Sequence, residues 1–342
     1  YFVVAQDLAG TPNVAINSGT FALAPTSVAL TAAAFPIGGT INSYGIVAGL
    51  NTTLTVGAAG DYTSLTGATG LFNAINTNGL VGNTTVNILD ASVTETGAIA
   101  LNQIQDGGCN AVAYTLLIKP NTGVTGTLTG TLNNRALIRI LSSNVTLDGS
   151  NSGGTTRDLT ITNTSVTGPS VVLIGSTGTT AVTGTTLKNS IVINGSQASY
   201  AVHISDTALG NAGYFNNITV QNNNIQQALI GVYANAVVAT GNGSGTLFTG
   251  NDLNTAGANS IRLVGLYAQG VDGVTISNNN IANMSNSLAE SPRAIWLATG
   301  TNSGTVSQNN ISTLASTNTG AFALTGIYVT PGTGATGITV NN

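Results

Sequence analysis

The chain has 342 residues, of which 42% are hydrophobic and only 5% are charged, and its formal net charge is −4. An ordinary globular protein has roughly 25% charged residues. The high hydrophobic share argues against a disordered chain. Seven cations scattered along an acidic sequence argue against a nucleic-acid surface. No apolar run reaches the roughly 20 residues that a membrane helix requires.

Residues 1–50 differ in pattern from the rest of the chain. Residues 1–7 predict a half-buried strand, and Ala24-Pro25 and Phe35-Pro36 interrupt the remainder of the segment with turns. The segment resembles the final strands of an immunoglobulin-like or fibronectin-like module. Alternatively, it lies along the repeats of the later chain. Because the chain opens at Tyr1 in mid-pattern, we expect it to be a segment of a longer polypeptide.

Residues 51–83 predict an end cap. A strand at 54–57 and a turn at 60–64 precede apolar residues at helical spacing, which predicts a helix over 64–78 with Ser64 or Thr63 as its N-cap. A solenoid needs such a cap because its first coil otherwise exposes the core and the strand edges. The apolar residues are Leu65, Ala68, Leu71, Phe72 and Ile75.

Residues 84–342 repeat a short motif in which a β-branched strand runs into an asparagine-rich corner closed by isoleucine. Complete copies occupy 218–225, 274–281 and 305–311, a degenerate copy occupies 247–253, and a further copy begins at Ile338. The period of about 28 to 34 residues predicts a solenoid. The last copy stops at Asn342, so we expect the solenoid to be truncated at its C-terminal end.

The same repeats contain a second strand of the form apolar, ring, apolar. Because side chains alternate along a strand, the aliphatic residues are expected in the core and the rings outside. These triplets are Val202-His203-Ile204, Val232-Tyr233-Ala234, Leu266-Tyr267-Ala268, Ile295-Trp296-Leu297 and Ile327-Tyr328-Val329. Ring-free triplets continue the register backwards to about nine coils through Val172-Leu173-Ile174, Ile138-Arg139-Ile140, Leu116-Leu117-Ile118 and Val86-Asn87-Ile88.

The order of strand, turn, helix and coils resembles the start of pectin-lyase-like right-handed parallel β-helices, especially those in large secreted, adhesin-like surface proteins of the Bacteroidota. Residues 144–149 and 158–163 match phrases that this family uses on successive strands. The resemblance covers about residues 52–342 and implies an all-β fold. That fold is a right-handed solenoid of about nine coils with a capping helix, preceded by a short β-rich segment.

The motifs by which enzymes of that superfamily cleave uronic-acid polymers are missing. The acidic residues lie in different turns, and none forms the paired strand positions that a general acid and base require. His203, with Ser205 and Asp206 nearby, invites a triad, but Ser205 shares its strand and face. Cys109 is the only cysteine, and we interpret it as a small, half-buried structural residue. We therefore expect no catalytic residue, no metal site and no cofactor.

The asparagine corners favour a structural interpretation over ligand binding. Asparagine tolerates the left-handed conformation, and stacked amides can hydrogen-bond from coil to coil.

A threonine row raises the alternative of an ice-binding face, although the row two residues on, which includes Thr162 and Lys188, is chemically mixed. The threonine row is Thr146, Thr160, Thr186, Thr219, Thr275, Thr305 and Thr339, interrupted by Leu247.

The predicted ligand-binding site is an exposed aromatic ladder. Parallel strands lie about 4.8 Å apart, so its rings would form a continuous file. Small residues two positions earlier (Gly231, Gly265, Ala294 and Gly326) would leave one flank of each ring open for a sugar or an extended peptide. The alternative is that the rings cover each other for stability. The ladder is His203, Tyr233, Tyr267, Trp296 and Tyr328.

These patterns together predict a non-enzymatic, secreted or cell-surface module that acts as a stalk or adhesin. Its expected partners are cell-surface glycans or other surface proteins, without nucleic acid or membrane insertion. Asp206-Thr207-Ala208 matches the pattern at which Bacteroidota attach O-glycans, so Thr207 is a candidate glycosylation site. The alternatives are a polysaccharide lyase or hydrolase whose active site is not in this segment, and an ice-binding solenoid.

Overall fold

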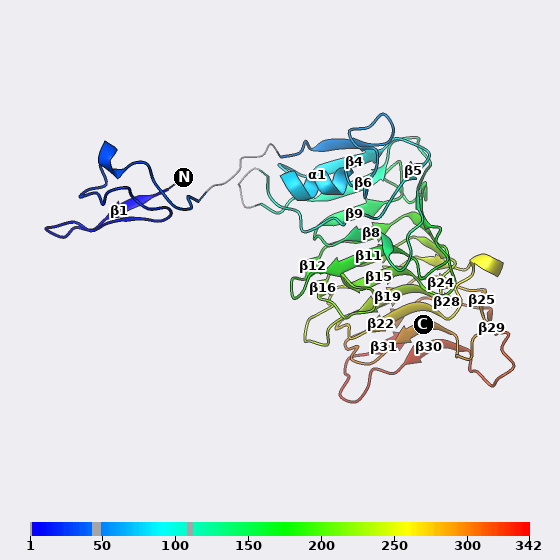
Figure 1. Cartoon of the computed structure of the whole chain (residues 1–342). Coiled ribbons are helices and arrows are strands. Elements are labelled where there is room, and N and C mark those ends of the chain that lie inside the picture. Colours follow the sequence, from blue (N-terminus) through cyan, green and yellow to red (C-terminus); the bar gives the residue numbers. More distant parts are fainter. Residues whose placement is uncertain (1, 43–48, 108–111) are drawn as a thin grey trace. The chain divides into compact units, whose positions relative to one another are not determined.

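The computed structural model describes residues 2–42, 49–107 and 112–342, so Cys109 lies outside the described residues. The chain divides into two compact units, Tyr1–Ala48 and Gly49–Asn342 (Figure 1). In the first unit, strand β1 (Val4–Gln6) pairs antiparallel with β2 (Val14–Ile16), and a 3₁₀ turn, η1, lies at Ala32–Ala34. The first unit is therefore a small antiparallel sheet with connecting turns.

The second unit is a parallel β-solenoid of about nine turns. Three parallel sheets form its walls, and Figure 1 shows their strands stacked from coil to coil. The ten-stranded sheet contains β3 (Thr53–Val56), β4 (Thr84–Ile88), β6 (Leu116–Pro120), β9 (Val145–Asp148), β13 (Thr186–Lys188), β17 (Thr219–Gln221), β20 (Leu247–Thr249), β23 (Thr275–Ser277), β27 (Thr305–Ser307) and β31 (Thr339–Asn341).

The other two walls come after the first along each coil. The eight-stranded sheet contains β5 (Val93–Thr94), β7 (Gly126–Gly130), β10 (Leu159–Asn163), β14 (Ser190–Asn194), β18 (Asn224–Gln226), β21 (Asp252–Leu253), β24 (Asn280–Ile281) and β28 (Asn310–Ile311). The seven-stranded sheet contains β8 (Ala136–Ile140), β11 (Ser170–Ser176), β15 (Tyr200–Asp206), β19 (Ile230–Asn235), β22 (Val264–Gln269), β26 (Arg293–Leu297) and β30 (Thr325–Val329). Shorter elements are β12 (Val182–Thr183) paired with β16 (Phe215–Asn216), β25 (Met284–Asn286) paired with β29 (Leu314–Ser316), and η2 (Gly257–Asn259).

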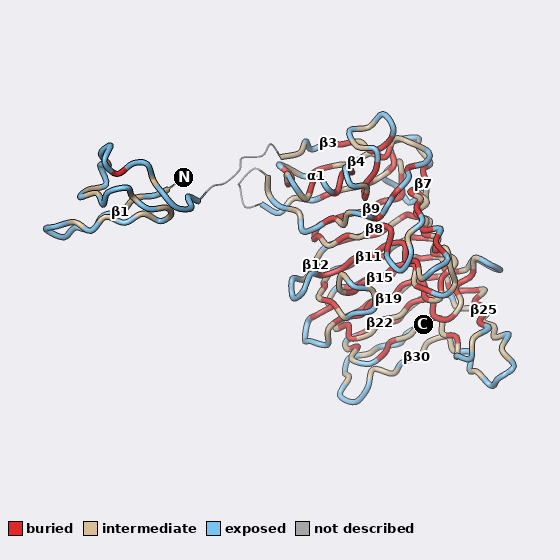
Figure 2. Tube along the Cα trace, viewed as in Figure 1, coloured by how far each residue is buried: buried red, intermediate tan, exposed pale blue. Residues whose placement is uncertain are grey.

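Aliphatic side chains from all three walls meet in one core that runs through the coils. Val232, Leu266 and Ile295 are fully buried and pair in register, as the triplets predict. Figure 2 shows that buried residues recur along the stacked strands. Each fully buried aliphatic side chain stabilises the fold by roughly 1.5 to 3 kcal/mol relative to an exposed one.

The prediction for the first coils is wrong in one respect. The triplets at 86–88 and 116–118 belong to β4 and β6 in the ten-stranded sheet, whereas Ile138–Ile140 lies in the seven-stranded sheet. Strand β8 is the edge strand of that sheet, and an isolated β-bridge joins its Ile140 to Leu101. Alternation with a period of two is the same on every wall, so the pattern alone does not reveal the wall to which a strand belongs.

The capping helix is shorter than predicted. Helix α1 spans Leu71–Asn78 with Gly70 at its N-cap, and Ala68, predicted on its apolar face, is exposed. The reason is Glu95, which is buried and accepts hydrogen bonds from the backbone N–H groups of Leu65 (2.8 Å) and Thr66 (2.7 Å). These contacts hold 65–66 outside the helix, while the buried residues Leu65, Leu71, Phe72 and Ile75 face the core as predicted.

The asparagine corners confirm the structural interpretation and divide it between two positions. Asn222 and Asn278 adopt positive φ angles of 51° and 57°. The next residue in each corner is buried, and its Nδ2 donates to the Oδ1 of the equivalent asparagine one coil on, with distances of 2.9 to 3.1 Å. This amide ladder consists of Asn223, Asn251, Asn279, Asn309 and Asn342.

The threonine row is real but shorter than predicted. Thr186 pairs with Thr146 and Thr219 in the ten-stranded sheet, and Leu247 interrupts the row as expected. Thr160 and Thr162 lie on β10 in the eight-stranded sheet, so they belong to neither predicted row. The second row contains an ion pair between Lys188 and Asp148 (3.0 Å), which makes this face chemically uneven.

Candidate functional site

The predicted ring ladder lies on the outer side of the seven-stranded sheet. Its rings form a continuous file, with centroids of adjacent rings between 4.4 and 5.8 Å apart. The strand register sets this spacing, because His203, Tyr233, Tyr267, Trp296 and Tyr328 pair directly from β15 to β30.

Sequence reasoning missed two members of the ladder. Tyr200 stacks on Tyr233 at 5.4 Å and also contacts His203 at 4.8 Å. The guanidinium of Arg293 lies over Trp296 at 4.2 Å and over Tyr328 at 4.6 Å. Tyr200 and Arg293 both stand three residues before a ladder ring, a spacing that strict alternation assigns to the opposite face of the strand, so the pattern contained no signal for them.

The ladder is less exposed than predicted. His203 has no exposed surface and Tyr233 is 8% exposed, whereas Tyr267, Trp296 and Tyr328 are partly exposed. A second apolar cluster, separate from the solenoid core, accounts for the burial of Tyr233. It consists of Ile230, Tyr233, Leu263 and Val264, with Tyr200, Leu229, Tyr267 and Trp296 packed against it.

The expectation of an open flank beside each ring is wrong. Cross-strand pairs place Ile230 beside Val264, and Val264 beside Arg293, and all three contact the ladder. Gly265 instead faces the core, where an added Cβ would lie 3.0 Å from Cγ2 of Ile281. Strict alternation therefore fails between 230 and 232 and between 264 and 266, and the ring flanks are occupied.

The ring faces are largely used by neighbouring rings. Tyr267 and Trp296 are stacked, with an interplanar angle of 2° and centroids 4.4 Å apart. Their polar atoms also have partners, because the Tyr267 hydroxyl donates to Gln269 (2.9 Å) and Trp296 Nε1 donates to Thr330 Oγ1 (2.8 Å). Of the two interpretations offered by the sequence, this geometry favours rings that cover each other.

His203 is not arranged as a catalytic base. Burial lowers the pKa of His203 to about 4, and neither ring nitrogen has a hydrogen-bond partner among the described residues. The Ser205 hydroxyl donates to the backbone oxygen of Asp206 (2.9 Å) and not to the imidazole. The ring instead packs between Tyr200 and Tyr233.

Thr207, the candidate glycosylation site, comes directly after β15 in a surface loop and is partly exposed. Its hydroxyl donates to Asp206 Oδ1 at 2.7 Å, and its backbone N–H donates to the same oxygen. The acidic residue of the Asp-Thr-Ala pattern therefore fixes the threonine locally.

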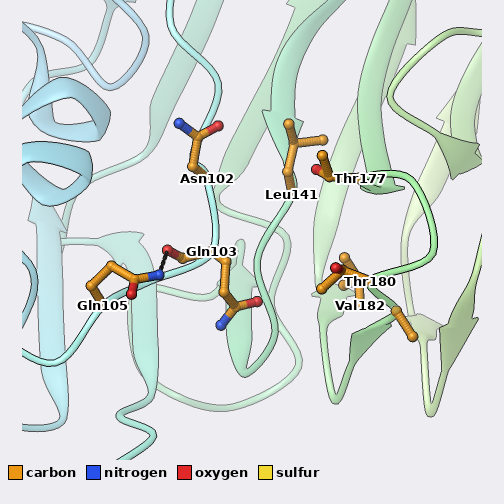
Figure 3. Close-up of a pocket in the computed structure, with 8 residues that line it drawn as sticks. Asn102, Gln103, Gln105, Leu141, Thr177, Thr180 and Val182 are labelled. Atoms are coloured by element: carbon orange, nitrogen blue, oxygen red, sulfur yellow. Dashed lines mark hydrogen bonds between the residues drawn. The ribbon is translucent and has the colours of Figure 1, made fainter.

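A cavity of about 400 Å³ opens elsewhere, between the segment 102–105 and the turn after β11. Figure 3 shows amide and hydroxyl side chains around it, with Leu141 and Val182 as apolar wall. Gln103 Oε1 accepts from the Ser143 N–H (3.1 Å). The side chains of Asn102, Thr177 and Thr180 make no hydrogen bond with any described residue. The volume is in the range of small-molecule sites.

The acidic residues act mainly as local structural groups. Asp252 pairs with Arg157 (2.6 Å), whose guanidinium also donates to the Asn222 backbone oxygen (2.8 Å). Within 2–42, 49–107 and 112–342, no group of three or more His, Cys, Asp or Glu side chains is placed to hold a metal ion. In the same ranges no helix has the length and apolarity needed to cross a membrane.

Comparisons with models of known protein families and with curated proteins give no match to this chain.

Proposed function

We propose that this chain is a non-enzymatic stalk or adhesin-type module of a secreted or cell-surface protein. The proposal is carried by the continuity of its side-chain stacks from coil to coil. A buried amide ladder runs along one corner and a file of rings runs along one wall, with Asn279 and Trp296 as typical members. Such stacks link successive coils from about residue 200 to the end of the described chain and favour a stiff, extended support.

The resemblance to secreted, adhesin-like β-helices of the Bacteroidota is consistent with this role and with an extracellular location. The outer positions of the ten-stranded sheet are largely threonine and serine, as in Thr275, Ser277 and Thr305. A polar, weakly charged exterior suits a module that remains in solution without attracting nucleic acid or anionic lipid.

If the module also binds glycans, the cavity in Figure 3 is a better candidate than the ring ladder. Saccharide hydroxyls need amide and hydroxyl partners, and Asn102, Thr177 and Thr180 offer such groups beside an apolar wall. In the ladder, by contrast, Tyr267 and Trp296 use their faces on each other.

Retention on glycan arrays and on cell surfaces tests this assignment. We expect Asn102→Ala with Thr180→Ala to reduce retention of the wild-type chain. Tyr267→Leu removes the ring but keeps part of the side-chain volume in the stack, and it should leave retention unchanged. Loss of retention only in the Tyr267→Leu variant would move the binding site back to the ladder.

A further inference from the structure

A second, smaller cavity lies on the outer side of the seven-stranded sheet near its β8 edge. Its volume is about 270 Å³. It is lined by residues 134–136 and Arg139 at strand β8, by Leu173 of β11 and by residues 207–209 in the loop after β15. Arg135 and Arg139 both line it, together with Thr207 and Leu209. Two of the seven cationic residues of the chain therefore share one small cavity.

Neither arginine is neutralised by an acidic side chain. Among the described residues the ion pairs are Arg157–Asp252 and Lys188–Asp148, and no ion pair involves the cavity. The nearby carboxylate of Asp206 accepts from the amide and hydroxyl of Thr207 instead. Neither guanidinium group therefore forms an ion pair within the described chain.

The Arg139 guanidinium is only partly satisfied. Its Nη2 donates to the backbone oxygens of Gly97 (3.2 Å) and Ala98 (3.0 Å), which hold the group in place. Its Nε is buried and has no hydrogen-bond partner in the described part of the chain. Burial, and after it the charge of Arg135, lowers the pKa of Arg139. An anion bound at the remaining guanidinium N–H groups of Arg139 and at Arg135 would offset the repulsion between the two cations.

We propose that this cavity binds the carboxylate or sulfate group of a small organic anion, with Arg135 and Arg139 as donors. Guanidinium groups match these anions in geometry and form charge-assisted hydrogen bonds with them. Leu173 and Leu209 provide an apolar wall for the carbon portion of the ligand. The Thr207 hydroxyl already donates to Asp206, so the arginines supply the donors. This inference does not depend on the stalk or adhesin assignment.

The test is an NMR titration that monitors the Nε–Hε signals of the five arginines (Arg135, Arg139, Arg157, Arg262 and Arg293). The probes are sulfate and propionate, each added at constant ionic strength against chloride, with 1-propanol as the uncharged analogue of propionate. We expect saturable shifts at Arg135 and Arg139 with both anions, and none with 1-propanol. Equal, non-saturating shifts at all five arginines would overturn the proposal.

Two substitutions sharpen the test. Arg135→Gln removes an exposed guanidinium without touching the core and should weaken binding about tenfold or more. Arg262→Gln, which removes a cation that contacts Ser287 away from the cavity, is the matched control and should leave the affinity unchanged. An unchanged affinity in Arg135→Gln, or an equal loss in Arg262→Gln, would contradict the assignment. The Arg139 signal reports binding in both variants.

Discussion

At the residue scale, neighbouring asparagines in one corner have different tasks. Asn278 is exposed and supplies a left-handed backbone position, whereas Asn279 is buried and links its coil to both neighbours. The sequence predicts both tasks for asparagine, because its side chain suits turns and amide stacking alike. It does not say which residue of Asn278-Asn279-Asn280 has which task, since that depends on the direction of each side chain.

Replacement of Asn279 by alanine should be strongly destabilising. The change removes the acceptor of the Asn251 backbone N–H (3.0 Å) and leaves that buried group unpaired. We expect the free energy of unfolding to fall by about 2 to 3 kcal/mol, measured by urea titration. Asn278→Gly is the matched control, because glycine accepts φ near 57° without strain, and it should change stability by about 0.5 kcal/mol or less. Similar losses in both variants would contradict the amide ladder.

His203 should make the fold sensitive to mild acid. Its pKa is about 4 in the folded chain and about 6.5 when unfolded, so the unfolded chain binds the proton more tightly. Stability contributed by neutral His203 is therefore present above pH 6.5 and is lost as the pH falls toward 4. A shift of this size corresponds to about 3 kcal/mol.

The His203→Leu variant isolates this effect. Leucine already occupies the paired position Leu173 on β11, so an aliphatic side chain is compatible with the row. Between about pH 7 and pH 4.5 the wild type should lose about 2 to 3 kcal/mol more unfolding free energy than the variant. Glu95, whose pKa is raised chiefly by burial, shifts stability in the opposite direction, but it is common to both proteins and cancels in the comparison. Parallel pH profiles would show that the imidazole is not buried.

At the element scale, the strand triplets predict core and exterior correctly up to Ile295-Trp296-Leu297, whereas Val329 of the last triplet is 37% exposed. The residues before the triplets do not obey the same alternation. Simple counting predicts that Gly231, Gly265 and Gly326 face outward, yet all three face core side chains, and only at Gly326 is there room for a Cβ atom. The cause is a local departure from the pleat between Val264 and Leu266, both of which pair in register with β19. A period-two pattern contains no signal for such a departure, whereas a run of glycines at one strand position does hint at close packing.

A matched pair of glycine substitutions tests this register. Gly265→Ala would place Cβ 2.5 Å from the Ala294 backbone oxygen, so we expect a loss of about 1 to 3 kcal/mol. Gly326→Ala occupies the equivalent position two coils later, where the nearest atom is 3.8 Å away, and should be close to neutral. Thermal unfolding of both variants gives the comparison. If alanine is tolerated equally at both positions, Gly265 faces the exterior of the solenoid and not the core.

The ring ladder should behave as a stabilising stack. Tyr267→Ala and Trp296→Ala, alone and combined, form a double-mutant cycle on the pair whose rings are parallel within 2°. We expect a coupling free energy of about 0.5 to 1.5 kcal/mol from unfolding titrations. A coupling near zero would mean that the rings pack independently and that their faces remain available to a ligand.

At the scale of the whole molecule, the period and the alternation of apolar residues are enough to predict a parallel solenoid. The cap is harder to predict, because the helix start depends on Glu95, a residue distant in sequence that takes the N–H groups of Leu65 and Thr66. The candidate site is harder still. Ring spacing reveals the ladder, but the burial of Tyr233 depends on Ile230, Leu263 and Val264, which lie outside the repeated pattern.

The proposed role as a scaffold without catalytic activity is best examined in a depolymerisation assay. The purified chain is incubated with a panel of neutral and acidic polysaccharides, and new reducing ends and unsaturated products are measured over time. We expect no more reducing ends or unsaturated products than the heat-unfolded chain gives. Release that is abolished by one substitution, such as Asp148→Asn or Asp252→Asn, with the fold retained, would contradict the scaffold role.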